Sequence, residues 1–116
     1  MRVLAVAVDG VRALSAIRTH SPQVAVLDLE MPGLTGLAIA RAVQESGLPT
    51  AIVLLTMHKA AHVVRSALDQ GITRYLLKED LGSHLIPAIE AAFEKRSYFS
   101  PQLLNATLRQ RIAQSS

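Results

Sequence analysis

The feature that most constrains this chain is a regular alternation of short β-rich runs with stretches of helical periodicity. Runs of valine, leucine, isoleucine and alanine predict four strands, at residues 2–8, 23–27, 50–55 and 72–77. Helices are predicted from Val11 to a stop at His20, over residues 34–45 and 59–70, from Asp80 to Phe93, and over 101–114. Strands that alternate with helices at such short intervals need crossover connections, and therefore predict a parallel sheet covered by helices on both faces.

The composition fits a single domain of this kind. With 116 residues, half of them apolar and 18% charged, the chain can build one hydrophobic core and is not a disordered segment. The absence of cysteine excludes a disulfide scaffold, thiol catalysis and a cysteine-based zinc site. No apolar run reaches the ~18 residues of a membrane span, and the first residues do not resemble a signal peptide. We therefore expect a soluble, cytoplasmic protein without membrane contact.

The net charge of +3 is concentrated at the end of the chain. Residues 95–116 carry four basic and no acidic side chains, so that the rest of the chain is nearly neutral. A nucleic-acid interface needs a clustered basic face, and single-strand binding needs aromatic side chains for stacking. Because both are sparse here, we expect the basic tail to be the solvated face of a helix.

Three side chains of different chemistry follow three of the predicted strands. Asp28 offers a carboxylate, Thr56 a hydroxyl and Lys78 a cation. In an open parallel sheet, ligands bind just past the carboxyl ends of the strands, and neighbouring strands lie ~4.8 Å apart. A carboxylate there can accept a phosphoryl group as an acyl phosphate, while the lysine neutralises its charge and the threonine donates a hydrogen bond to it.

Each of these residues also has an ordinary structural interpretation. An aspartate before a turn often only forms that turn, a threonine at a strand end reflects β propensity, and a lysine there is usually solvated. Their combination, in this order and at successive strand ends, favours a shared site.

The segments around these residues resemble the receiver domains of bacterial two-component response regulators, in particular those of the NarL/FixJ (LuxR-type) family. The resemblance rests on VLDLEMPGLTG at 26–36, LLT at 54–56, GITRYLLK at 71–78 and YFSP at 98–101. It implies a flavodoxin-like (CheY-like), doubly wound parallel sheet.

The same resemblance implies roles for individual residues. Asp28 would accept phosphate from a sensor histidine kinase, and Thr56 and Lys78 would contact the phosphoryl group. Tyr75 would be the aromatic that changes rotamer when Thr56 moves. Asp28 and the backbone carbonyl of Glu30 would be ligands of Mg²⁺, and residues 72–94 would form the switch and dimer surface.

The chain departs from the receiver pattern before Asp28. Receivers begin with a strand that ends in two adjacent acids, which hold Mg²⁺, whereas Asp9 is the only acid upstream of Asp28 and Gly10 follows it. Residues 2–8 can be aligned with the first receiver strand or with the second; we favour the second. In the first alignment Asp9 is a remnant of the acidic pair. Without two upstream carboxylates, Mg²⁺ would keep only Asp28 and a backbone carbonyl, which makes a weak site, and we expect Asp28 to be phosphorylated poorly.

If residues 2–8 are the second receiver strand, the central strand of the sheet has no counterpart here, which would leave buried backbone groups unpaired. Residues 2–8 could shift into the place beside Asp28, or a second chain could supply a strand in a swapped homodimer. A misassigned start or a fragment is a third explanation. The expected fold is thus incomplete at its N-terminus, with four recognisable strands.

For the whole chain we expect a receiver domain over 1–96 and a linker helix over 97–116. Known relatives continue into a helix-turn-helix that this chain lacks, so DNA contact would need that domain. The expected function is phosphorelay control of transcription by a non-enzymatic module. One alternative is a pseudo-receiver that acts in dimerisation or protein interaction without phosphorylation; a more remote one is a small phosphotransfer or hydrolytic enzyme.

Overall fold

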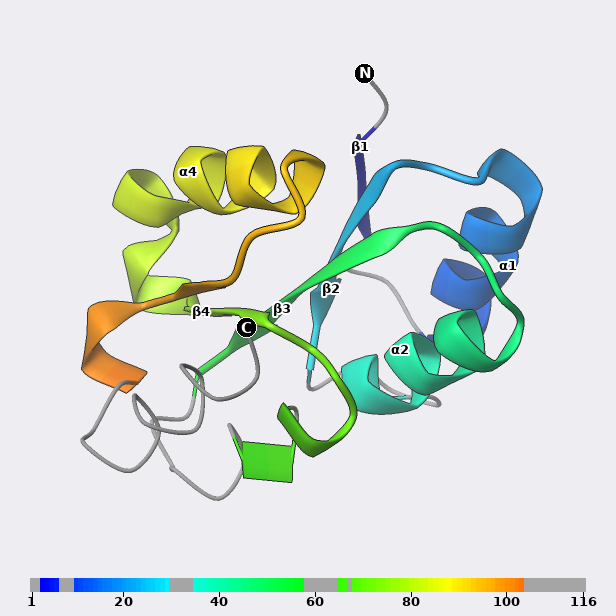
Figure 1. The fold of residues 1–116 in the computed structure, drawn as a ribbon, viewed down its shortest axis with the longest axis horizontal. Coiled ribbons are helices and arrows are strands. Elements are labelled where there is room, and N and C mark those ends of the chain that lie inside the picture. Colours follow the sequence, from blue (N-terminus) through cyan, green and yellow to red (C-terminus); the bar gives the residue numbers. More distant parts are fainter. Residues whose placement is uncertain (1–2, 7–9, 30–34, 58–64, 67, 104–116) are drawn as a thin grey trace.

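The protein is described by a computed structural model that covers residues 3–6, 10–29, 35–57, 65–66 and 68–103. Its strands form one parallel sheet with the order β1-β2-β3-β4-β5 (Figure 1). The strands are β1 (Val3–Val6), β2 (Val24–Asp28), β3 (Ala51–Thr56), β4 (Arg74–Leu77) and β5 (Tyr98–Phe99). The first four confirm the predicted strands, and where the flanking residues are described the ends differ by up to two residues.

Helices cover both faces of this sheet, as Figure 1 shows. They are α1 (Gly10–His20), α2 (Gly36–Glu45) and α4 (Leu81–Phe93), with short 3₁₀ turns η1 (Lys78–Asp80) and η2 (Pro101–Leu103). The helix predicted over 59–70 lies mostly outside the described residues, as does the last one beyond residue 103. Within the described ranges, no helix is long and apolar enough to cross a membrane.

The doubly wound arrangement follows from strands that are apolar on both sides. Successive side chains of a strand point to opposite faces, so a continuous apolar run has to be covered twice. Leu27 and Leu54 pack with α1 and α2 in one hydrophobic cluster. Val26 and Val53 pack with α4 in a second cluster on the other face. The predicted α/β class, with a parallel sheet between two helical layers, is confirmed.

The first strand lies beside the strand that ends in Asp28. β1 pairs with β2 in parallel, from Val3 with Val24 to Val6 with Leu27. Residues from the start of the chain therefore occupy the place next to the strand of Asp28, an arrangement that both alignments of residues 2–8 allow. This leaves β1 and β5 as the two outer strands of the sheet.

The fifth strand was not predicted as one. Residues 97–116 were expected to form a linker helix, yet Tyr98 and Phe99 pair with Arg74 and Tyr75 on the outer side of β4. Two residues are too few to give a recognisable period, although aromatic residues favour strands. The division of the chain at 96 and 97 remains a prediction, but the first residues after it belong to the sheet.

The connection to this strand also has an unusual hand. α4 covers the face opposite to α1 and α2, although the strand order continues in the same direction from β4 to β5. The crossover through α4 therefore has the opposite hand to those through α1 and α2. Parallel crossovers are almost always right-handed, so the two-residue strand is an addition to the regular part of the sheet rather than one of its framework strands.

Candidate functional site

The register of the sheet brings the three predicted site residues to one edge. Asp28, the last residue of β2, is level with Leu55, one residue before the end of β3. Thr56 ends β3 and is level with Leu77, the last residue of β4. Lys78 follows directly. The carboxylate, hydroxyl and cation thus stand at the carboxyl ends of three adjacent strands, as the sequence predicted.

An ion pair joins the first and the last of these residues. The Lys78 Nζ lies 2.5 Å from the Asp28 Oδ2, and the two side chains are 31% and 20% exposed. An opposite charge at such a distance stabilises both charged forms, and partial exposure leaves the pair open to exchange with a ligand. Lys78 therefore balances the charge of the carboxylate on which a phosphoryl group would be placed.

Thr56 stands beside this pair at the base of a hollow. Its side chain is fully buried, whereas the next residue, Met57, is 71% exposed. The hollow has a volume of about 460 Å³ and is lined by Thr56, Met57, Leu77, Lys78 and Glu79. The lysine thus contacts Asp28 and also borders open space in which an anion could be held.

The end of β2 and the start of α2 are each held by hydrogen bonds. The backbone N–H of Leu29 donates to the Leu55 carbonyl at 2.8 Å, which extends the ladder past Asp28. α2 begins after Thr35, whose Oγ1 accepts a hydrogen bond from the N–H of Ala38, a standard helix N-cap. A backbone hydrogen bond thus holds the strand end, and a side-chain N-cap holds the start of α2.

Gly36, the first residue of α2, allows a very close approach to the site. A Cβ at this position would lie 2.9 Å from the Asp28 carbonyl oxygen and 2.9 Å from a methyl carbon of Leu54. Both contacts are shorter than carbon and oxygen atoms tolerate, so only glycine fits without movement. The structural reason for this glycine is therefore its packing against the end of β2.

The end of β4 is held by a residue that sequence reasoning missed. The backbone N–H of Leu77 donates to the Oγ of Ser100 at 2.9 Å, and both residues are fully buried. In the sequence, Ser100 and Pro101 indicated the start of a helix and belonged to the YFSP segment of the family resemblance, but neither assigned a role to the hydroxyl. No local pattern shows that a hydroxyl 22 residues beyond Lys78 caps its strand.

Tyr75 is fully buried, level with Leu54 on one side and Phe99 on the other. It belongs to the cluster beneath α1 and α2. Its predicted change of rotamer remains a prediction, and in the conformation described here its ring is packed inside.

The described residues do not supply a good magnesium site. Receiver domains bind Mg²⁺ where they are phosphorylated. The predicted ligand Glu30 lies outside the described residues, and among those described no group of three or more acidic, histidine or cysteine side chains could hold a metal ion. The carboxylate of Asp28 is itself paired with Lys78. Since Mg²⁺ requires a near-octahedral oxygen shell, the donors among the described residues do not complete its coordination by themselves.

Comparison with known proteins agrees with this architecture. Residues 1–90 match the response regulator receiver domain family. The probable transcriptional regulatory protein NarL of Mycobacterium tuberculosis is 36% identical over 97% of this chain and 54% of its own length. The oxygen regulatory protein NreC of Staphylococcus epidermidis is 33% identical over 99% and 53%. The chain thus spans about half the length of these curated relatives.

Solved structures give the same result. The receiver domain of the putative response regulator NarL from Mycobacterium tuberculosis superposes with a TM-score of 0.72 at 38% identity, over 76% of this chain and 71% of that one. A LuxR-family two-component response regulator from Aurantimonas sp. SI85-9A1 gives 0.77 at 29% identity, over 93% and 74%. The chain therefore belongs to the response regulator receiver domain family, in its NarL/FixJ (LuxR-type) branch.

Proposed function

We propose that this chain is a phosphoacceptor module in which Asp28 takes a phosphoryl group from a sensor histidine kinase. The observation that carries the proposal is the ion pair of Asp28 with Lys78 at the carboxyl edge of the sheet, beside the buried Thr56. A carboxylate at that edge is the nucleophile, and the lysine and the threonine are the groups that hold the transferred phosphoryl oxygens.

The transfer exchanges one bond to phosphorus for another. An Asp28 carboxylate oxygen attacks the phosphorus of a phosphohistidine, and the new O–P bond forms as the P–N bond breaks. The electron pair of the broken bond stays on the imidazole nitrogen, which takes up a proton from water. Lys78 then moves its contact from the carboxylate to a phosphoryl oxygen, so its charge follows the negative charge.

The rate of this step is expected to be low in the chain as it stands. Phosphoryl transfer depends on cationic groups that neutralise the developing charge. In the described site that charge is neutralised by Lys78, which is initially committed to Asp28. We therefore propose slow phosphorylation. We also propose a role in transcriptional control, exercised together with a region of the kind that the longer relatives have and this chain does not span.

The ion pair between Asp28 and Lys78 is also compatible with a second candidate function. If Asp28 and Lys78 stay paired under all conditions, the module is a pseudo-receiver that acts by dimerisation or protein interaction. The Asp28–Lys78 pair is then a permanent structural bond rather than a site, and neither a kinase nor a phosphodonor alters the protein.

Intact mass spectrometry after incubation with acetyl phosphate separates these candidates. The phosphoacceptor proposal expects slow addition of a single phosphoryl group, abolished in Asp28→Asn and retained in Asp69→Asn, a matched change at an exposed aspartate. No addition to the unaltered chain would establish the pseudo-receiver instead. Continuous release of phosphate without a stable adduct would indicate a small hydrolytic enzyme, the remote alternative.

A further inference from the structure

The segment that follows α4 is bonded along the edge of the strand that leads to Lys78. We call residues 98–103 the edge segment. The N–H of Tyr98 donates to the Thr73 carbonyl at 2.8 Å, and the N–H of Ser100 donates to the Tyr75 carbonyl at 3.1 Å. These bonds alternate along the strand as in a parallel ladder, and they continue toward the site.

At the site end of this ladder a side chain takes the place of the backbone. The carbonyl of Ser100 accepts from the N–H of Leu103 at 2.9 Å, because the chain turns into η2 there. The Ser100 hydroxyl instead accepts the N–H of Leu77 at 2.9 Å. Since both residues are fully buried, no water can replace the hydroxyl if it is lost.

Leu77 connects this bond to the reacting groups. It is level with Thr56 across β4 and β3 and immediately precedes Lys78. The peptide group held by Ser100 therefore lies directly before the lysine that pairs with Asp28. Ser100 can therefore affect the position of Lys78 through the Leu77 peptide, without contacting the reacting atoms itself.

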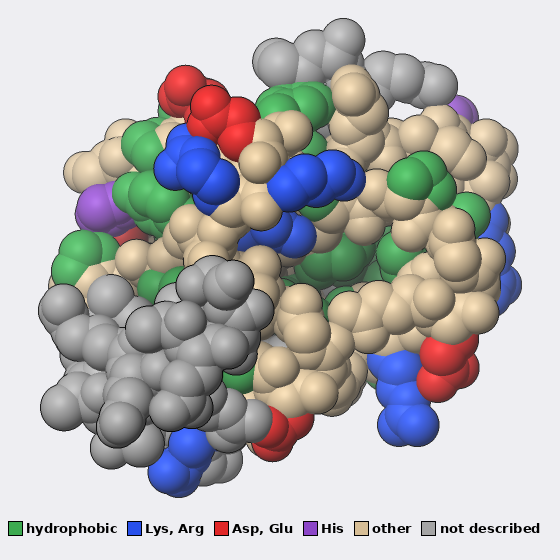
Figure 2. All heavy atoms as spheres, in the orientation of Figure 1, with side chains coloured by type: hydrophobic (Ala, Val, Ile, Leu, Met, Phe, Trp, Pro, Cys, Tyr) green, Lys and Arg blue, Asp and Glu red, His purple; other side chains and the backbone are tan. Residues whose placement is uncertain are grey.

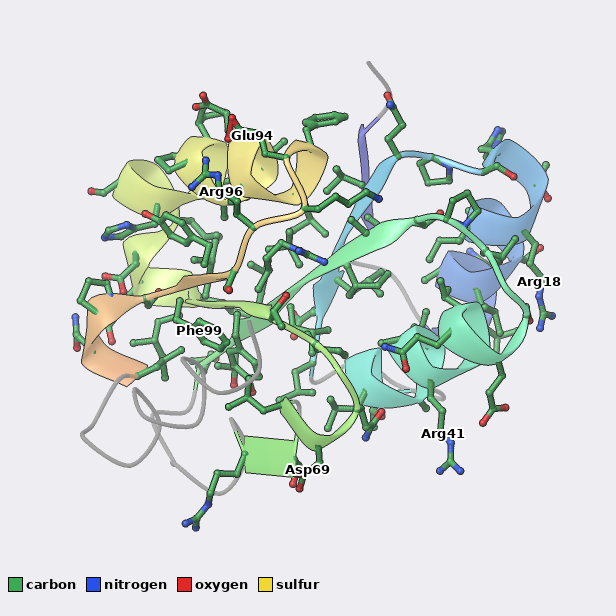
Figure 3. The ribbon with its side chains drawn as sticks, in the orientation of Figure 1. Arg18, Arg41, Asp69, Glu94, Arg96 and Phe99 are labelled. Carbon is green, nitrogen blue, oxygen red and sulfur yellow. The ribbon has the colours of Figure 1, made fainter. Side chains whose placement is uncertain are left out.

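The rest of the edge segment is anchored away from the site. Phe99 and Leu103 are 9% and 3% exposed and pack into the cluster beneath α1 and α2. The Tyr98 hydroxyl lies 2.6 Å from the Nδ1 of His84 on α4. Figure 3 shows Phe99 on the extended segment that runs beside β4. The segment is thus attached at several points, of which the Ser100 hydroxyl is the one next to the site.

We propose that Ser100 is a positioning residue for Lys78 and that it couples the site to the edge segment. The inference rests on the proposed phosphoacceptor function. When Lys78 follows a phosphoryl group on Asp28, the Leu77 peptide moves with it and the bond to Ser100 weakens. Because coupling is reciprocal, anything that pulls the edge segment from β4 also displaces Lys78.

The test compares Ser100→Ala, which removes only the hydroxyl, with Tyr98→Phe, which removes a hydroxyl of the same segment at its far end. In the unmodified protein, NMR should show faster exchange of the Leu77 amide and shifted Asp28 carboxyl and Lys78 ammonium signals in Ser100→Ala only. These signals require no phosphorylation, so they test the positioning role even if Asp28 accepts no phosphate.

With acetyl phosphate, phosphorylation of Ser100→Ala should be ~10-fold slower than that of the unaltered chain, since small misplacements of a reacting group cost rate steeply. Phosphorylation of Tyr98→Phe should be unchanged. The inference is overturned if Ser100→Ala leaves the Asp28 and Lys78 signals in place. It is equally overturned if Tyr98→Phe shifts them as much, because the effect would then be general loosening of the segment.

Discussion

The two ends of β4 each carry a cation, and the two cations are held in different ways. Arg74 begins the strand and is partly buried; its Nε donates to the Ile52 carbonyl and its Nη1 to the Arg96 carbonyl, both at 3.1 Å. Lys78 follows the other end and pairs with a carboxylate beside a hollow. Both side chains carry the same charge, so the difference lies in their partners and surroundings. Arg74 bonds backbone carbonyls and has a structural role, whereas Lys78 borders open space and can bind a ligand.

The Arg74 side chain donates a hydrogen bond to a carbonyl of β3 that lies before the first residue paired with β4. The ladder between β3 and β4 starts at Leu54 and Tyr75, so the Ile52 carbonyl lies before it. The guanidinium supplies the donor that a longer β4 would have supplied from its backbone. Burial lowers the pKa of Arg74 from its ordinary value, because desolvation disfavours the charged guanidinium.

The surroundings of this end of β4 are also charged. Arg96, whose carbonyl accepts from Arg74, forms an ion pair with Glu94 (Figure 3). On the face seen in Figure 2, Lys and Arg side chains gather next to acidic ones near α4. Because the Arg96–Glu94 pair is exposed, it contributes little to stability compared with the partly buried hydrogen bond from Arg74 to the Ile52 carbonyl.

Replacement of Lys78 is expected to have the largest effect on the site. Lys78→Ala should slow phosphorylation of Asp28 by ~100-fold, because a preorganised cation at the developing charge is lost. Thermal unfolding should change little, since the pair is partly exposed. The rate is measured by intact mass with acetyl phosphate, and Lys95→Ala, at an exposed lysine, is the control. Equal slowing in both variants would refute a specific role for Lys78.

Replacement of Arg74 should give the opposite pattern. Arg74→Ala removes two hydrogen bonds and leaves the Ile52 carbonyl without this donor, which should cost ~2 kcal/mol in the free energy of unfolding. Phosphorylation below the unfolding transition should stay within about twofold. Denaturant titration measures the loss, and Arg41→Ala, which breaks an exposed pair with Glu45, should cost less than ~0.5 kcal/mol. A slowed reaction in folded Arg74→Ala would abolish the contrast between the two ends.

Replacement of Gly36 tests whether stability and phosphorylation rate also change independently of each other at the end of β2. Gly36→Ala forces apart the start of α2 and the end of β2, at a cost of ~1–2 kcal/mol, and should also slow phosphorylation severalfold. Gly82→Ala is the matched control because a Cβ there meets no atom within 4 Å, and it should be neutral or slightly stabilising. Identical unfolding curves for the two variants would show that the contact at Gly36 relaxes freely.

Much of the framework could be predicted from the sequence because it depends on short-range pattern. Continuous apolar runs located four strands, and the rule that ligands bind past strand ends selected Asp28, Thr56 and Lys78. The place of β1 stayed open, because backbone pairing leaves little trace in the residues of a strand.

The missed contributions depend on contacts between distant parts of the chain. Ser100 bonds a backbone group 23 residues away, and Arg74 bonds one 22 residues away. Gly36 is required by the backbone of Asp28 rather than by its own turn. Such roles carry no spacing or composition signal, because the same residues in another tertiary setting would be an ordinary helix start, surface cation or turn glycine.

The presence of β5 has a practical consequence for anyone who shortens this protein. Main-chain groups on an open strand edge are a ready template for association with other molecules. Residues 98–103 occupy that edge of β4 with their own hydrogen bonds. A version that stops at residue 96, the boundary suggested by the sequence, would expose the edge of β4 and tend to aggregate. A version that extends to Leu103 keeps this edge covered.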